Sequence, residues 1–224
     1  MSILYIVATP IGNLEDITNR ALRVLSEVDL ILCEDTRKTR ILLDRFQIKT
    51  LTLSYHQHSK IEKINYIADL LRQKKNIALV SDAGTPGISD PGNKLIQQLL
   101  NFPIDELKIV PVPGASAVSA ALSISGFPTD RFLFLGFVPV KNKRKKFFEE
   151  VVASKYPVIF YESPFRIIKT LNELGSMDEE LNLVVCREMT KKFETIYYGK
   201  IKDVIIKIEE DEQRGEFVVI VSKK

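Results

Sequence analysis

The chain has 224 residues and a formal net charge of +3, with 45% hydrophobic and 27% charged residues. These values are ordinary for a globular protein of one or two domains, and the charge alone is too small to indicate nucleic-acid binding. No apolar run approaches the ~20 residues of a membrane span, and the N-terminus has neither a basic region nor a small-residue cleavage site. We therefore expect a cytoplasmic protein without membrane contact.

The first half of the chain alternates between predicted strands and helices. Apolar runs predict strands over residues 3–8, 29–33, 50–54, 76–80 and 107–112. Helical spacing predicts helices capped by Thr18 and Thr36, and others over residues 61–71, 94–100 and 117–125. This order predicts an α/β domain over residues 1–125, with a mainly parallel sheet covered on both faces.

The second domain is expected over residues 126–224, after a linker rich in Gly and Pro at residues 126–130. Strands are predicted over residues 131–138, 158–162, 181–187, 194–198 and 217–221. Helices are predicted from the basic run at residues 141–146, from Pro164, and over residues 201–208. The closely spaced strands at 181–187 and 194–198 could pair as a hairpin, so we expect a mixed sheet.

Four predicted strand ends in the first half carry residues suited to ligand binding. They are residues 9–13, 34–37, 81–92 and 113–116. The longest of these loops contains three glycines and two prolines together with Asp82. Because the carboxyl ends of parallel strands share one edge, the four loops are expected to converge on a site.

Several kinds of site are disfavoured by missing motifs. The sequence lacks the dinucleotide fingerprint, the P-loop and the serine-hydrolase elbow. Cys33 and Cys186 lie in separate apolar runs, and the histidines are His56 and His58, so we expect buried free thiols and no metal site. The remaining possibility is an adenosine-type ligand held largely by backbone, with Asp82 accepting from hydroxyl or ammonium groups.

The charged block after the second strand suggests catalytic residues. Glu34 and Asp35 could simply stabilise a helix N-terminus, but Arg37 in the first turn is not explained that way. Our hypothesis is that Glu34 or Asp35 is a general base and that Arg37 positions a phosphate or stabilises an alkoxide.

Two basic groups could contact RNA, although solvated helix faces would explain them equally well. The candidate RNA-binding residues are Lys38, Arg40, Lys141, Lys143, Arg144 and Lys145.

The motifs together resemble those of the tetrapyrrole methylase family, the class III S-adenosylmethionine methyltransferases. The resemblance covers nearly the whole chain. It rests on residues 8–14 (ATPIGNL), 33–37 (CEDTR), 81–92 (SDAGTPGISDPG), 112–117 (VPGASA), 134–137 (FLGF) and 161–166 (YESPFR).

The resemblance implies two α/β domains with S-adenosylmethionine in the cleft between them, and a homodimer. It implies 2'-O-methylation of a cytidine ribose in the decoding region of small-subunit ribosomal RNA, either free or in the 30S subunit. By motif position, the implied donor-binding residues are Pro10, Gly12, Asp82, Ala83, Gly84, Ile88, Ala115 and Ser116 in the first domain and Leu135, Tyr161 and Glu188 in the second.

Many family members continue into a small helical segment thought to help bind RNA, whereas this sequence ends at residue 224. The expected RNA contacts therefore shift toward residues 141–146, and lysines from a dimer partner are a further possible source. Two other functions stay open. One is C-methylation of a tetrapyrrole, which a large apolar acceptor pocket would favour, and the other is a non-catalytic RNA- or nucleotide-binding module.

Overall fold

A computed structural model describes residues 1–56, 59–90 and 92–223. His58 lies outside the described residues. The chain forms two compact units, Met1–Ser116 and Ala117–Lys224, and each is described by itself. The units divide after Ser116, ahead of the linker that the sequence suggested at residue 126. The reason is that the intervening helix α5 (Ala117–Ile124) contacts a strand of the second unit.

The first unit contains a five-stranded sheet in which every strand pairing is parallel. The order across the sheet is β3-β2-β4-β1-β5. The strands are β1 (Ser2–Val7), β2 (Leu30–Cys33), β3 (Thr52–Ser54), β4 (Ile77–Leu79) and β5 (Leu107–Val112). The predicted parallel sheet is thus confirmed, and its central strands are continuous apolar runs because both faces are covered.

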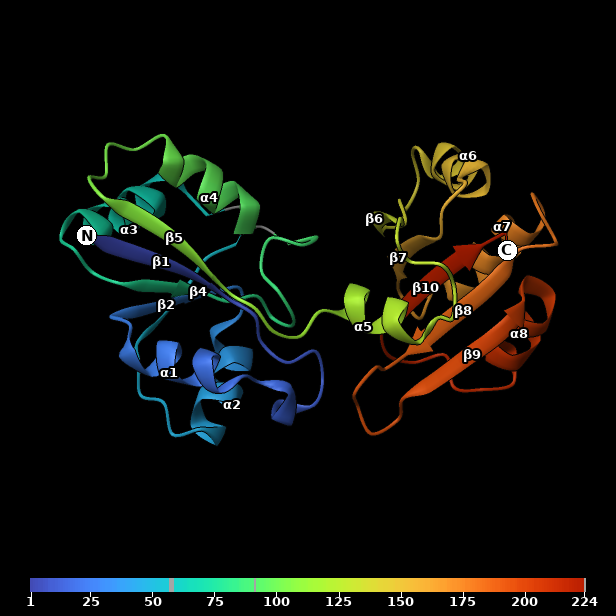
Figure 1. Cartoon of the computed structure of the whole chain (residues 1–224), viewed down its shortest axis with the longest axis horizontal. Helices are drawn as coiled ribbons and strands as arrows, with labels where there is room; N and C mark the ends of the chain where they lie inside the picture. The colour runs from blue at the N-terminus through green and yellow to red at the C-terminus, as the bar shows by residue number, and fades with distance from the viewer. Residues whose placement is uncertain (57–58, 91, 224) are drawn as a thin grey trace. The chain divides into compact units, whose positions relative to one another are not determined.

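Helices cover the two faces of this sheet (Figure 1). A short 3₁₀ helix, η1 (Leu14–Asp16), and then α1 (Asn19–Glu27) follow β1, and α2 (Thr36–Arg45) follows β2. On the opposite face lie α3 (Ile61–Arg72) and α4 (Gly92–Leu100). Alternate residues of β1 serve the two cores: Val7 packs with Leu25 of α1, and Leu4 packs in the cluster of Ile67 and Leu95.

The helix caps of the first unit agree with the sequence at one helix and differ at another. The Thr18 side chain caps α1 by accepting a hydrogen bond from the Ala21 N–H at 3.0 Å. The predicted Thr36 cap of α2 is wrong, because Asp35 is the N-cap and accepts from the Arg37 N–H. A carboxylate at the N-cap also interacts favourably with the positive end of the helix dipole.

The second unit contains a mixed five-stranded sheet in the order β6-β7-β10-β8-β9. The strands are β6 (Leu133–Phe137), β7 (Val158–Glu162), β8 (Asn182–Arg187), β9 (Thr195–Lys200) and β10 (Phe217–Ser222). β6 and β7 pair in parallel, while β10 runs antiparallel to both β7 and β8. The predicted hairpin is confirmed as β8 and β9, which pair over six residues each.

One face of the second sheet carries a large apolar core with three helices, α6 (Arg144–Ala153), α7 (Ile167–Gly175) and α8 (Ile201–Glu209). Val219 and Val185 face this core, whereas their neighbours Ile220 and Cys186 are buried on the other face. Helix α5 contacts β10. The helix predicted from Pro164 begins three residues later, after a turn closed by the Arg166 N–H and the Ser163 carbonyl.

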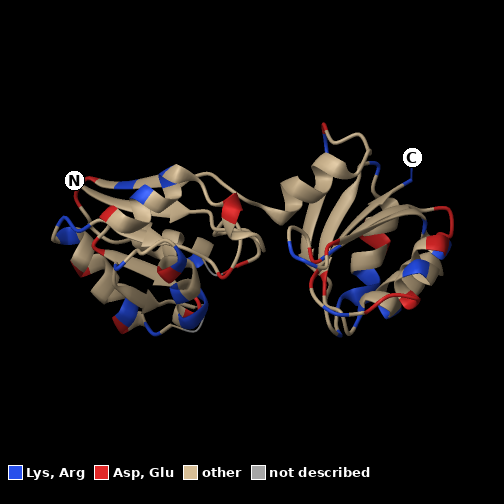
Figure 2. Cartoon of the chain, turned by 90° about the horizontal axis from the view of Figure 1, so that it is seen from below, with Lys and Arg blue, Asp and Glu red and all other residues tan. Residues whose placement is uncertain are grey.

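Charged residues lie mainly on the helices and connecting loops of both units, and the strands are mostly uncharged (Figure 2). Cys33 and Cys186 are buried free thiols, as expected, and burial raises the pKa of Cys186 to about 12. Within the described residues, no helix combines the length and apolar character needed to span a bilayer. The same part of the chain contains no group of three or more His, Cys, Asp or Glu side chains able to hold a metal ion.

Candidate active site

The carboxyl ends of β1 and β4 are joined by backbone hydrogen bonds. The Thr9 N–H donates to the Gly84 carbonyl at 2.9 Å, and the Gly84 N–H donates to the Thr9 carbonyl at 3.0 Å. A third strand end joins them, because the Thr85 hydroxyl donates to the Ala115 carbonyl at 3.0 Å. The predicted convergence of these loops is therefore a feature of the first unit.

Gly84 is the residue that allows this close approach. Its φ is +80°, a region that L side chains rarely adopt, and an added Cβ would lie 3.2 Å from Cγ2 of Ile11 and 3.7 Å from the Ala115 carbonyl oxygen. Gly114 is similar in crowding, since a Cβ there would lie 3.0 Å from Cβ of Ala8. Gly84 is buried and lets the loops pack closely, whereas Gly114 is exposed and leaves backbone without a side chain at the edge of the sheet.

Asp82 links this loop to the end of β2. Its Oδ1 accepts from the Asp35 N–H at 3.1 Å, and its Oδ2 pairs with Lys38 Nζ at 2.7 Å. In return, the Asp82 N–H donates to Oε1 of Glu34 at 3.4 Å. All four predicted loops are thereby connected, and the two charged motifs form one cluster.

Glu34 has the properties of a general base within this cluster. Burial raises its pKa above the ordinary 4.5, and the negative charges of Asp82 and Asp90 add to the effect. The hydrogen bond from the Asp82 backbone opposes the shift only in part. A carboxylate with a raised pKa is a stronger proton acceptor once it is ionised.

Asp35 has the opposite character. Nε of Arg37 donates to its Oδ1 at 3.0 Å, and the Arg37 Nη2 donates to its Oδ2 at 2.8 Å. These bonds and that from the Arg37 backbone lower the pKa of Asp35 to about 2. Asp35 is therefore a cap and a partner for Arg37, and of the two base candidates Glu34 is the better suited.

The far part of the long loop is braced internally. Both carboxylate oxygens of Asp90 accept from the Gly87 N–H at 2.8 Å, and Oδ1 also accepts from the Gly92 N–H at 2.7 Å. Gly92 is the first residue of α4. This carboxylate fixes the loop and starts the helix, which is the role that the sequence suggested for this end of the loop.

The candidate donor-binding residues of the first unit lie on these joined loops. Gly12, Asp82, Ala83 and Ile88 are exposed, Gly84 and Pro10 are buried, and Ala115 and Ser116 are half-buried. An adenosine-type cofactor needs close backbone approach and a carboxylate acceptor. The glycine-lined edge and Asp82, whose oxygens each retain acceptor capacity, fit these needs.

In the second unit, two candidate donor-binding residues lie on adjacent strands. The pairing of β6 with β7 shifts register between Phe134 and Phe137, which brackets Leu135, and Gly136 there has a φ of +65°. The Tyr161 ring packs edge-on between Phe134 and Phe137, with both centroids 5.1 Å away. Bulges of this kind are frequent next to binding sites because they re-aim side chains.

Glu188, the third candidate in that unit, has its carboxylate engaged in a local cluster. It accepts from Lys191 Nζ at 2.8 Å and from the Glu216 N–H at 2.9 Å. Partial burial raises its pKa, but these hydrogen bonds outweigh that effect, so the pKa is lowered overall. Its role in donor binding stays a prediction.

The basic run separates into an inner and an outer face. Arg144 is only 9% exposed and bonds to Glu173 at 2.6 Å and to the Thr170 hydroxyl at 2.7 Å. Its guanidinium also lies 5.0 Å from the Phe148 ring centroid. This cation is therefore engaged inside the second unit. The other candidates, Lys141, Lys143 and Lys145 here and Lys38 and Arg40 on α2, are exposed.

Comparison with known proteins identifies the family. The model of the Tetrapyrrole (Corrin/Porphyrin) Methylases matches residues 3–205. The chain belongs to the tetrapyrrole methylase family. This confirms the resemblance seen in the motifs, and the two α/β units have the fold of the family's solved members.

The relatives of this tetrapyrrole methylase include several proteins named Ribosomal RNA small subunit methyltransferase I. The protein from Synechocystis is 44% identical over 99% of this chain and 79% of its own length. The protein from Thermotoga maritima is 40% identical over the full length of both chains. A solved uroporphyrin-III C-methyl transferase from Thermus thermophilus, complexed with S-adenyl homocysteine, shares the fold with a TM-score of 0.67. It is 17% identical, and the match covers 98% of this chain and 97% of that one.

Proposed function

We propose that this protein transfers a methyl group from S-adenosylmethionine to the ribose 2'-oxygen of a cytidine in the decoding region of small-subunit ribosomal RNA. Family membership and the names of relatives at 40–44% identity support methylation of small-subunit rRNA. The observation that carries the ribose assignment is Glu34, a carboxylate with a raised pKa among the joined strand ends. A ribose hydroxyl needs such a base because its own proton is held tightly.

The residues of the first unit that would hold the donor are Pro10, Gly12, Asp82, Ala83, Gly84, Ile88, Ala115 and Ser116, with Leu135, Tyr161 and Glu188 proposed from the second. S-adenosylmethionine supplies an electrophilic methyl group on a sulfonium. Asp82 is the natural acceptor for donor hydroxyl or ammonium groups, and Lys38 holds its carboxylate in place at 2.7 Å. Lys38 is thus a positioning residue as well as a candidate RNA contact.

Glu34 accepts the proton of the ribose hydroxyl as the oxygen bonds to the methyl carbon and the carbon–sulfur bond breaks. The electrons of the broken bond remain on sulfur, and Glu34 later releases its proton to solvent. Such general-base assistance contributes ~10²–10⁴-fold, and the remainder of the acceleration comes from placing oxygen, carbon and sulfur in line. Arg37, held by Asp35, presents a permanent cation for a backbone phosphate of the RNA.

The exposed cations Lys38, Arg40, Lys141, Lys143 and Lys145 are the proposed RNA contacts. A homodimer, which the family resemblance implies, and a cytoplasmic location are parts of the same proposal.

The test is transfer of a tritiated methyl group from S-adenosylmethionine to three acceptors: unmodified 30S subunits, free rRNA and a tetrapyrrole. The proposal predicts label in the RNA of at least one ribosomal acceptor and none in the tetrapyrrole. Label in the tetrapyrrole alone would assign C-methylation. Tight donor binding without transfer to any acceptor would assign a binding module.

A further inference from the structure

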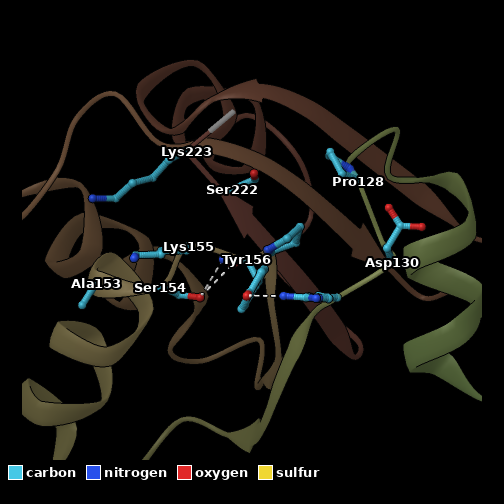
Figure 3. A pocket seen from close by; sticks show the side chains of 10 residues that line it. Pro128, Asp130, Ala153, Ser154, Lys155, Tyr156, Ser222 and Lys223 are labelled. Atoms are coloured by element: carbon cyan, nitrogen blue, oxygen red, sulfur yellow. Dashed lines mark hydrogen bonds between the residues drawn. The ribbon is translucent and has the colours of Figure 1, made fainter.

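A pocket of about 680 Å³ lies in the second unit, away from its candidate donor-binding residues. Its lining comes from the segment before β6, the turn between α6 and β7, and the end of β10 (Figure 3). The volume falls within the range of sites that enclose a nucleotide-sized ligand. None of the candidate RNA-binding residues from the sequence lines it.

An aromatic ring is held in this pocket by its neighbours. The Tyr156 hydroxyl accepts from Nη1 of Arg131 at 3.0 Å, and that guanidinium carbon lies 5.7 Å from the ring centroid. The Ser154 hydroxyl donates to the Tyr156 carbonyl at 2.8 Å and accepts from its N–H at 3.1 Å. Arg131 therefore holds the hydroxyl of the ring and Ser154 holds the Tyr156 backbone, yet Tyr156 remains 44% exposed. A fixed, exposed aromatic ring is a platform on which an unpaired base can stack.

The charges of the lining favour an anion. Arg131, Lys155 and Lys223 are cationic, against a single carboxylate on Asp130. Lys155 and Lys223 are drawn on the same side of the pocket, away from Asp130 (Figure 3). Lys223 pairs with Asp178 at 3.5 Å, and a partly exposed pair of this kind competes little with a phosphate.

The strand registers place this pocket at one end of the strands of the second sheet. The beginnings of β6 and β7 and the end of β10 meet there, since Leu133 pairs with Val158 and Val158 with Val221. Tyr161 and Arg187, next to Glu188, lie toward the opposite end of the strands, where they pair with Val218 and Phe217 of β10. The intervening length of β10 corresponds to about 10–17 Å. A ligand here would be separate from the donor-binding residues of this unit.

We propose that this pocket is a second RNA-binding site, which holds an unpaired nucleotide of the rRNA substrate by stacking on Tyr156 and by contacts of Lys155 and Lys223 with its phosphate. The inference rests on the proposed function, because that function supplies the RNA. Ring and cations together match single-stranded RNA, in which bases are free to stack and phosphates lie beside them.

The test compares Tyr156→Ala and the double variant Lys155→Glu/Lys223→Glu with wild type. The matched control is Lys169→Glu/Lys202→Glu, which makes the same charge change at exposed lysines outside the pocket. KM for unmodified 30S subunits is expected to rise about 10-fold in Tyr156→Ala, because the base can no longer stack. The double lysine variant should also lower the salt dependence of RNA binding. The slope of the logarithm of the binding constant against the logarithm of the salt concentration should decrease by about 0.7 for every phosphate that the lysines no longer neutralise.

In these pocket variants kcat and the affinity for S-adenosylmethionine should stay within twofold of wild type, and the control should match wild type throughout. An active wild-type enzyme with unchanged KM in the pocket variants contradicts the pocket inference alone. Saturable binding of cytidine monophosphate that rRNA does not displace would also overturn it. A wild-type enzyme with no activity on any ribosomal acceptor contradicts the proposed function itself.

Discussion

Replacing Gly84 by alanine tests the way in which the strand ends of the first unit are joined. Gly84 has a φ of +80°, and its backbone exchanges two hydrogen bonds with Thr9. An alanine there must adopt a left-handed conformation, which costs ~1–2 kcal/mol. Its Cβ must also displace Cγ2 of Ile11, which would lie only 3.2 Å away. The change therefore disturbs both the backbone conformation at residue 84 and the close packing of the loops.

Gly126→Ala is the matched control. Gly126 has a similar φ of +71°, but nothing lies within 4 Å of the position that its Cβ would take. The control therefore carries the conformational cost without the crowding. Any additional loss in Gly84→Ala measures the close packing of the loops.

The assays are thermal unfolding followed by calorimetric titration with S-adenosylmethionine. Both variants should lower the unfolding free energy by about 1–2 kcal/mol, which corresponds to a few degrees in Tm for a chain of this size. Gly84→Ala should lower it further and should weaken donor binding by about 10-fold or more, while Gly126→Ala should bind the donor as wild type does. Equal stability and equal donor affinity in the two variants would refute the reasoning.

Three further predictions follow from the charged groups. Glu34→Gln should lower kcat by ~10²–10⁴-fold, because the general base is lost. Asp35→Asn keeps an N-cap and removes no usable base, so it should lower kcat less than 10-fold. Equal losses of kcat in steady-state kinetics would show that Glu34 is not the base. Because the pKa of Glu34 is raised, the folded state binds its proton more tightly than the unfolded state, so ionisation above pH 4.5 reduces stability. Glu34→Gln should therefore be at least as stable as wild type at pH 7. The acid limb of the pH profile of kcat should lie above pH 4.5, and a limb below that value would contradict the shift. Arg144→Met should cost ~2–4 kcal/mol in denaturant unfolding, since it removes a buried guanidinium from the buried Thr170 hydroxyl and the buried Glu162 carboxylate. The exposed control Lys145→Met should change stability by less than about 0.5 kcal/mol, and similar values for the two would show that Arg144 is not structural.

The sequence predicted the parallel sheet of the first unit because strands and helices alternate along that half of the chain. It also predicted the hairpin of β8 and β9, since the two strands lie only a few residues apart. The convergence of the loops followed from parallel topology alone, without knowledge of any side-chain contact.

Other features depend on tertiary contacts that no local pattern encodes. The pair of Lys38 with Asp82 joins residues 44 positions apart, so Lys38 looked like a surface cation. Arg144 sits among solvent-exposed lysines, and only the packing of α6 against Glu173 on α7 reveals which cation turns inward. The cap of α2 was displaced by one residue because either Asp35 or Thr36 has a suitable side chain.

The central claim is methyl transfer to a ribose oxygen of small-subunit rRNA with Glu34 as base. The most direct measurement is mass spectrometry of nucleosides from unmodified 30S subunits and free rRNA, each incubated with S-adenosylmethionine and either wild type or Glu34→Gln. We expect 2'-O-methylcytidine at one decoding-region position with the wild type, and formation slower by about 100-fold or more with the variant. A methyl group on a base, or equal rates for the two proteins, would contradict it.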